Sequence, residues 1–146
     1  MVETNLIFFS NLHDSWDGLQ RGFVAFLFLM LFDLTWFRIS SVTRLYDGVI
    51  TRPKVSIAAV LVTWIILASA LGVQQNPAVW SESMIYGALV GFVAYGVYNG
   101  SNYATLKTWS TKIALTDTIW GSTACSVTSL MLFYIFHQPK NLKKTV

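Results

Sequence analysis

The sequence predicts an all-α membrane protein, a bundle of four transmembrane helices. Hydrophobic residues make up 54% of the 146-residue chain, and charged residues make up 12%, about half the share usual in soluble domains. A soluble domain of this size has too much surface to cover with so few charges. The apolar residues also fall into four blocks, each close to the roughly 20 residues that a helix needs to cross a bilayer.

Residues 1–18 are expected to form a surface segment ahead of the first span. Apolar residues in this segment allow a short interfacial helix: Leu6, Phe8, Phe9, Leu12 and Trp16. A mostly irregular tail is the equally favoured alternative. No basic stretch precedes an apolar core here, so we expect no cleavable signal peptide.

The first two predicted spans cover residues 19–37 and 55–73. The first carries charges only at Arg21, near its edge, and at Asp33. The second carries no charge and is the most uniformly apolar block of the chain. Pro53 lies just before it, where a helix boundary is expected because proline cannot continue a preceding helix.

The last two predicted spans cover residues 80–99 and 113–136. The third is the least hydrophobic of the four, and the fourth carries Asp117 as its only charge. Pro77 precedes the third span, again at an expected helix boundary. The four spans make one transmembrane domain over residues 19–136, which predicts a multi-pass integral membrane protein.

The two membrane faces differ in their content of Lys and Arg. The first and third loops share one face with six of these residues, and the other face has four. The positive-inside rule then places the loops in the cytoplasm and both termini outside. The basic tail, residues 137–146, ends in KKTV, and Lys143 and Lys144 fit a retrieval signal of the endoplasmic reticulum that requires a cytosolic C-terminus. A plain basic tail is the other interpretation. The orientation and the identity of the membrane therefore stay open.

A cluster of polar side chains is expected at one membrane face. Asp33 lies near the end of the first span and Asp117 near the start of the fourth, and a four-span chain brings both points to the same face. A carboxylate just inside a bilayer needs a donor, a cation or water. The candidate polar cluster comprises Asp33, Trp36, Tyr95, Tyr98, Asn99, Asn102, Asp117 and Trp120. The expected partners of Asp33 are Arg38, Asn99, Asn102, Lys112 and a hydroxyl of Tyr95 or Tyr98.

Two interpretations of this cluster stay open. It is either a hydrogen-bonded clamp between helices or a polar pocket for a cation, a proton or a lipid headgroup. No spacing specifies a metal, so we expect neither a metal site nor a cofactor. We also expect no enzyme, because His13 and His137 lie outside the spans and in no catalytic motif. The formal charge of +3 sits in the loops and the tail, so no nucleic-acid binding is expected.

Small residues predict close contacts between helices. Gly87 and Gly91 form a GxxxG pair in the third span, which allows two helix backbones to approach closely. Gly121 begins a second stripe of small residues in the fourth span, continued by Cys125 and Ser129. Packing inside the chain is favoured over a dimer contact for the GxxxG pair.

The segment from residue 87 to 121 carries a family resemblance. Its elements are Ala94-Tyr95, Tyr98-Asn99-Gly100-Ser101-Asn102, Ala104-Thr105-Leu106, Trp109 and Asp117-Thr118-Ile119-Trp120-Gly121, with Asp33-Leu34-Thr35-Trp36, Tyr46 and Gly48 earlier in the chain. These residues resemble the bacterial membrane-protein family catalogued as domain of unknown function 2177, over about residues 20–136. The resemblance implies a membrane fold and no particular activity. The chain departs from the pattern at Asn99, where the family has Asp, and in its N-terminal extension.

The favoured function is that of a non-enzymatic structural or assembly component of a larger membrane complex. Its partners would be the lipid bilayer and other protein subunits. The N-terminal extension, the altered motif and the KKTV end favour a eukaryotic setting, such as an organelle complex or the internal membrane of a large DNA virus. The alternative is a small transporter or an ion- or lipid-binding protein that uses the polar pocket around Asp33 and Asp117. An enzyme acting on lipids ranks third.

Overall fold

The computed structural model describes residues 2–49, 56–74 and 77–137, with only the backbone given for residues 2–15 and Ser40. Helices make up the regular structure of these residues, so the all-α prediction is confirmed. The helices are α1 (Val2–Trp36), α2 (Ser40–Leu45), α3 (Ile57–Gly72), α4 (Trp80–Thr105) and α5 (Thr111–Phe136).

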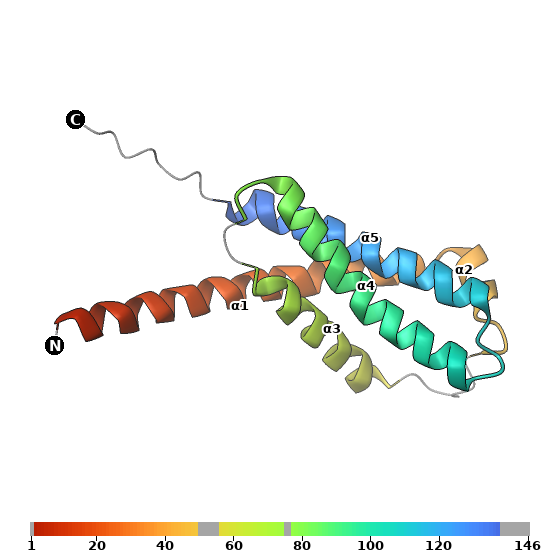
Figure 1. Ribbon diagram of the computed structural model, residues 1–146. Coiled ribbons are helices and arrows are strands. Elements are labelled where there is room, and N and C mark those ends of the chain that lie inside the picture. The colour runs from red at the N-terminus through yellow and green to blue at the C-terminus, as the bar shows by residue number, and fades with distance from the viewer. Residues whose placement is uncertain (1, 50–55, 75–76, 138–146) are drawn as a thin grey trace.

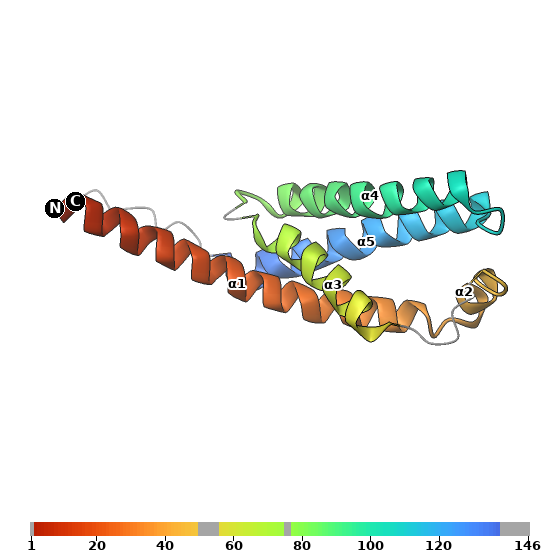
Figure 2. The same ribbon diagram turned by 90° about the horizontal axis from the view of Figure 1, so that it is seen from below.

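The four long helices pack as two pairs. α4 and α5 run antiparallel, side by side along nearly their whole length, and α3 lies against α1 (Figures 1 and 2). α1 also contacts α5, which joins the two pairs. The short α2 lies at the end of the bundle where α4 turns into α5, and the first turns of α1 project beyond the other helices (Figure 2).

Local hydrogen bonds explain where three of the helices begin. Ser56 and Ser110 accept hydrogen bonds from the backbone N–H groups of Ala59 (3.4 Å) and Ile113 (3.2 Å), so each serine caps the helix that follows it. Before α4, the Glu82 carboxylate accepts a hydrogen bond from the backbone N–H of Ala78, at 2.8 Å. An acidic residue in the first turn of a helix also complements the helix dipole.

Each predicted span overlaps one long helix but differs from it in extent. α1 begins at Val2, so the backbone of residues 2–18 is helical and continuous with the first span, and the irregular tail that was the alternative for this segment is wrong. No proline or glycine precedes Gly18, and nothing in this stretch therefore interrupts a helix. α4 continues past the predicted end at residue 99 to Thr105, and α2 was not predicted. The tail from residue 138 and Pro53 lie outside the described residues.

The outer surface of the bundle is strongly apolar. Large hydrophobic side chains on all four long helices are more than half exposed, among them Phe23, Ile66, Phe92 and Ile119. Polar side chains are buried instead: Arg21, Ser83, Asn99, Asp117, Thr128 and Ser129. Such a distribution is unfavourable in water and fits a helix bundle surrounded by lipid.

Two helices are long and apolar enough by themselves to cross a membrane, within the part of the chain that the structure describes. They are Trp16–Trp36 of α1 and Thr111–Phe136 of α5. α3 is apolar but has 16 residues, which gives a helix of about 24 Å against a hydrocarbon core of about 30 Å. α4 is long enough but carries more polar residues.

Glycines bring α4 and α5 into backbone contact. A Cβ atom added to Gly91 would collide with the backbone carbonyl oxygen of Gly121, and one added to Gly87 with that of Cys125. Gly121 itself lies under the ring of Tyr95. The structure thus places the GxxxG pair at a contact inside the chain, where any larger side chain would push the helices apart.

Candidate functional site

The carboxylate of Asp33 joins all four long helices. Asp33 lies on α1, and its Oδ2 atom accepts a hydrogen bond from the indole N–H of Trp64 on α3, at 2.8 Å. Its Oδ1 atom accepts one from the indole N–H of Trp120 on α5, at 3.0 Å. The hydroxyl of Tyr95 on α4 donates a longer bond of 3.4 Å to Oδ2. A single side chain is therefore held by one donor from each of the other three helices.

Ring contacts orient the two indoles toward Asp33. Trp36, one turn after Asp33, stacks on Trp120 with the ring centroids 4.4 Å apart and an interplanar angle of 7°. Phe26 packs its ring edge-on against Trp64, at 6.2 Å between centroids. Because such contacts restrict ring rotation, the two N–H donors are positioned in advance for the carboxylate.

Asp117 on α5 forms a second, more deeply buried centre. Its Oδ2 atom accepts a hydrogen bond from the Asn99 amide on α4, and its Oδ1 atom accepts one from the Tyr46 hydroxyl, both at 2.8 Å. Asp117 is only 7% exposed. Both donors are neutral, so the carboxylate is held by hydrogen bonds and not by an ion pair.

The side chain of Asn99 connects the two centres. Its amide nitrogen donates to Asp117 and also to the backbone carbonyl of Tyr95, at 2.9 Å. Its carbonyl oxygen accepts a hydrogen bond from the indole N–H of Trp109, at 3.1 Å. Both amide hydrogens and the carbonyl are thereby used, which fixes the orientation of the amide. The hydroxyl of Tyr95 donates to Asp33, so the residue Tyr95, through its backbone and its side chain, links the hydrogen bonds of one carboxylate to those of the other.

Loop residues close the bundle over Asp117. Tyr46 follows α2, and Trp109 lies between α4 and α5; their rings meet edge-on at 6.2 Å. Together with Val42 and Ile113 they form a small buried core. Burial raises the pKa of the Tyr46 hydroxyl well above its usual value, and the negative charge of Asp117 raises it further. The hydroxyl therefore stays protonated and remains a donor to the carboxylate.

The structure brings most of the candidate polar cluster together, in two groups. Tyr95 and Trp120 donate to the Asp33 carboxylate, and Trp36 stacks on Trp120. Asn99 donates to Asp117. Tyr98 and Asn102 form no hydrogen bond with either carboxylate; Tyr98 is 54% exposed and packs edge-on against Trp109.

Most of the expected partners of Asp33 do not reach it. Of these partners, only the Tyr95 hydroxyl contacts Asp33; Asn99 bonds to the other carboxylate. Arg38 and Lys112 are exposed, as long charged side chains usually are at the ends of apolar helices. Within the described part of the chain, neither Asp33 nor Asp117 forms an ion pair.

Three donors were missed by the sequence-based prediction. Trp64 is the single tryptophan of an otherwise apolar span, and its N–H needs an acceptor when buried, which was a usable signal. Tyr46 and Trp109 were noted as elements of the family pattern but were not placed in the cluster. Their donor role depends on the loop packing, which periodicity does not predict.

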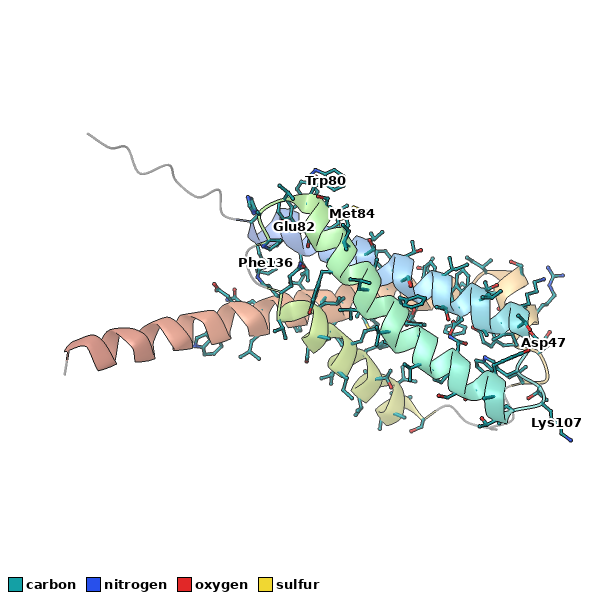
Figure 3. All side chains as sticks on the ribbon, viewed as in Figure 1. Asp47, Trp80, Glu82, Met84, Lys107 and Phe136 are labelled. Atoms are coloured by element: carbon teal, nitrogen blue, oxygen red, sulfur yellow. The ribbon has the colours of Figure 1, made fainter. Side chains whose placement is uncertain are left out.

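The two ends of the bundle carry different chemistry. Asp47 and Lys107 mark the end near the carboxylate network, whereas Glu82 and Phe136 mark the other end (Figure 3). At this other end, the guanidinium of Arg21 donates to the backbone carbonyl of Gln74 at 3.1 Å. It also lies over the ring of Phe136, at 5.2 Å from its centroid.

The network offers hydrogen-bonding groups rather than a metal-binding set. Among the described residues, no group of three or more His, Cys, Asp or Glu side chains lies close enough to hold a metal ion. Cys125 is buried beside α4, and His137 stacks on Phe133 at the opposite end of the bundle. The geometry therefore provides two carboxylates, each fixed by neutral donors.

Comparison with known proteins identifies the family. Residues 21–134 match the family described as Predicted membrane protein (DUF2177), which confirms the resemblance drawn from the central motif. Comparisons with curated proteins and with solved structures give no match. The matched region contains both carboxylates and every donor in the network. Because the match covers well over half of the chain, the protein belongs to this family of membrane proteins.

Proposed function

We propose that the protein is a non-enzymatic, four-span integral membrane protein that serves as a structural or assembly component of a larger membrane complex. The observation that carries this proposal is the Asp33 centre, where one carboxylate accepts hydrogen bonds from three other helices. Such an arrangement fixes the relative positions of the helices, and its oxygen atoms are already engaged by protein donors. That favours a rigid bundle over an open binding site.

The faces of α3 and α4 support four spans, although two helices alone pass the length and composition test. The outward side chains of α4 are apolar and exposed: Ile85, Leu89, Phe92, Val93 and Val97. Its polar residues Ser83 and Asn99 point inward and are buried. Part of the low average hydropathy of α4 therefore comes from its buried side, and the exposed polar residues Glu82, Ser101 and Thr105 lie near its two ends, while the outer side between them suits lipid.

α3 is shorter than the bilayer core, but its apolar surface and local thinning of the lipid would allow it to span the membrane. Ile57, Val62, Ile65 and Ile66 are exposed on it, and its polar Trp64 donates inward to Asp33. A short apolar helix adapts to a bilayer by local thinning of the lipid, at a fraction of a kcal/mol per Å of mismatch. We therefore place α3 across the membrane beside α1.

An assembly role is supported by the described part of the chain, which consists of the helices and the connections between them. The described connections are short, and the loop between α4 and α5 spans only residues 106–110. Its Trp109 and the Tyr46 loop turn inward to cap the network. The large remaining surface is apolar, and partner subunits within the membrane would pack against it.

The second candidate is a small transporter or an ion- or lipid-binding protein. Asp33 and Asp117 lie in one hydrogen-bonded network without a cationic partner among the described residues. Carboxylates inside transmembrane bundles occur along proton and cation pathways of membrane transporters. This observation keeps the alternative open to a direct test.

The two functions are separated by purification and by flux measurements. The structural role predicts that the protein co-purifies with stoichiometric partners in mild detergent, and that proteoliposomes of the purified chain show no proton or sodium flux. Asp117→Asn should keep the partners. Flux that disappears in Asp117→Asn, while the protein stays folded, would reject the structural role in favour of transport.

A further inference from the structure

A shallow groove lies beside the network at the end of the bundle marked by Asp47 and Lys107 in Figure 3. It has a volume of about 230 Å³ and is formed by the last residue of α1, the segment around α2 and the first turns of α5. The residues that line it are Trp36, Ile39, Ser41, Val42, Leu45, Lys112 and Thr116. Trp36 ends α1 and Lys112 lies in the first turn of α5, so the groove sits at the level where two proposed spans leave the membrane.

The lining combines two kinds of chemistry. Lys112, Ser41 and Thr116 offer an ammonium group and two hydroxyls, and the other lining side chains are apolar. Lys112 is exposed and forms no hydrogen bond or ion pair within the described ranges. An ammonium group beside hydroxyl donors suits a phosphate, and the adjacent apolar wall suits the start of an acyl chain.

The net positive charge at this end of the bundle also suits a ligand with a phosphate group. Its exposed charged side chains in the described part of the chain are Arg38, Arg44, Lys107 and Lys112, against Asp47 as the acidic one. Positive residues at a membrane surface attract acidic lipids, by about 1 kcal/mol for each Lys or Arg near the surface. The start of α5 adds the positive end of a helix dipole.

We infer that this groove binds the phosphate headgroup of an acidic phospholipid, with Lys112 as the main contact. The inference rests on the proposed four-span arrangement, which places the groove at the bilayer surface. The bound lipid would pack against Trp36, whose ring stacks on the Asp33 donor Trp120. Lipid occupancy would then stabilise the same network that holds the helices together.

The test measures binding of phosphatidylglycerol to the whole chain in phosphatidylcholine nanodiscs. Lys112→Gln should weaken apparent binding about fivefold, the change expected from removing one cation near a headgroup. Lys107→Gln is the matched control, since it removes the same charge from the same end but outside the groove. At a salt concentration of about 0.15 M, binding in this control should stay within about twofold of the wild type, because Lys107 lies outside the groove and its attraction to the headgroup is screened by salt. Equal weakening in both variants would mean a general surface attraction and would overturn the inference.

A second arm identifies the source of the phosphate. Inorganic phosphate, added in place of phosphatidylglycerol, should neither bind nor compete, because it lacks the acyl chain that the apolar wall contacts. Full competition by inorganic phosphate would reject a lipid site. Accessibility labelling of both membrane faces on the same variants shows whether the bundle is inserted with four spans. If the bundle inserts with four spans but Lys112→Gln binds lipid as the wild type does, the lipid site is wrong and the four-span arrangement stands. If the bundle does not insert with four spans, the proposed arrangement itself is wrong.

Discussion

Replacing Asp33 with asparagine should destabilise the bundle, because all of its partners are donors. In the native protein, the indole N–H groups of Trp64 and Trp120 point at different oxygen atoms of the carboxylate. An asparagine side chain has one oxygen and one NH₂ group. Whichever way the amide turns, one indole N–H faces another donor and loses its acceptor.

The same change at Asp117 should be tolerated. An asparagine there can direct its oxygen to the Asn99 amide and its NH₂ group to the Tyr46 oxygen, because a hydroxyl accepts as well as donates. One hydrogen bond then replaces another. Asp117→Asn is therefore a matched control that removes the same charge from the same network.

The expected difference follows from the hydrogen bonds lost. A hydrogen bond to a charged group contributes about 1.5–3 kcal/mol, and interhelical bonds between neutral groups in membranes average about 0.6 kcal/mol. We expect Asp33→Asn to lower the free energy of unfolding by about 2 kcal/mol and Asp117→Asn by less than about 1 kcal/mol. For a chain of this length, about 2 kcal/mol corresponds to a fall in Tm of about 4–8 °C.

Thermal unfolding in detergent, followed by the helical circular dichroism signal, measures this difference. Tryptophan fluorescence is unsuitable, because the substitution itself changes the surroundings of Trp64 and Trp120. Trp64→Phe should reproduce part of the Asp33→Asn effect by removing one donor. Two results would contradict the role of Asp33 in holding the helices together. One is a melting temperature of Asp33→Asn equal to that of the wild type, and the other is a lower melting temperature for Asp117→Asn than for Asp33→Asn.

Three further outcomes are expected. Gly91→Ala should destabilise the bundle by about 1–3 kcal/mol, because the added Cβ meets the backbone of α5. Gly100→Ala is the control and should be neutral or stabilising, because the space around its Cβ is open. Equal melting temperatures for the two variants would place Gly91 away from the contact between α4 and α5. Tyr46→Phe should lower the free energy of unfolding by about 1 kcal/mol and speed amide hydrogen exchange in residues 41–49. Unchanged exchange would show that the hydrogen bond to Asp117 does not hold this loop in place. Since the pKa of Tyr46 is raised in the folded protein, its contribution to stability is complete below about pH 10 and falls progressively as the pH rises from there toward the folded-state pKa. Alkaline destabilisation should therefore be weaker in Tyr46→Phe, and an identical pH profile would show that Tyr46 is not the group that titrates.

Much of the architecture could be predicted because a bilayer imposes a length on apolar segments. The predicted spans 55–73 and 113–136 nearly coincide with α3 and α5. The chain beyond the apolar blocks was harder to predict. Residues 2–18 and α2 have no hydrophobic length signal, so their helical backbone follows from the absence of helix breakers and from packing of Val42 and Tyr46 on Trp109.

The carboxylates were predictable as a site because each is a charge inside an apolar block. Topology alone brings Asp33 and Asp117 to the same end of the bundle. Their donors were only partly predictable. Amides, cations and a tyrosine hydroxyl were expected at Asp33, and the donors found there are two indoles and the Tyr95 hydroxyl. Trp120 was included in the candidate polar cluster, but Trp64 was not, although an indole N–H is a donor that a buried carboxylate can use.

The most direct test of the four-span bundle is the accessibility of single cysteines from each membrane face. In a Cys125→Ser background, cysteines replace the exposed residues Asp47 and Lys107 at one end and Ala78 and His137 at the other. A maleimide that cannot cross membranes is applied to sealed vesicles and then to opened ones. The account predicts that positions 47 and 107 react together and that positions 78 and 137 react together from the opposite face. If positions 47 and 107 react from opposite faces, the four-span arrangement is wrong, and so is the shared membrane face of the two carboxylates.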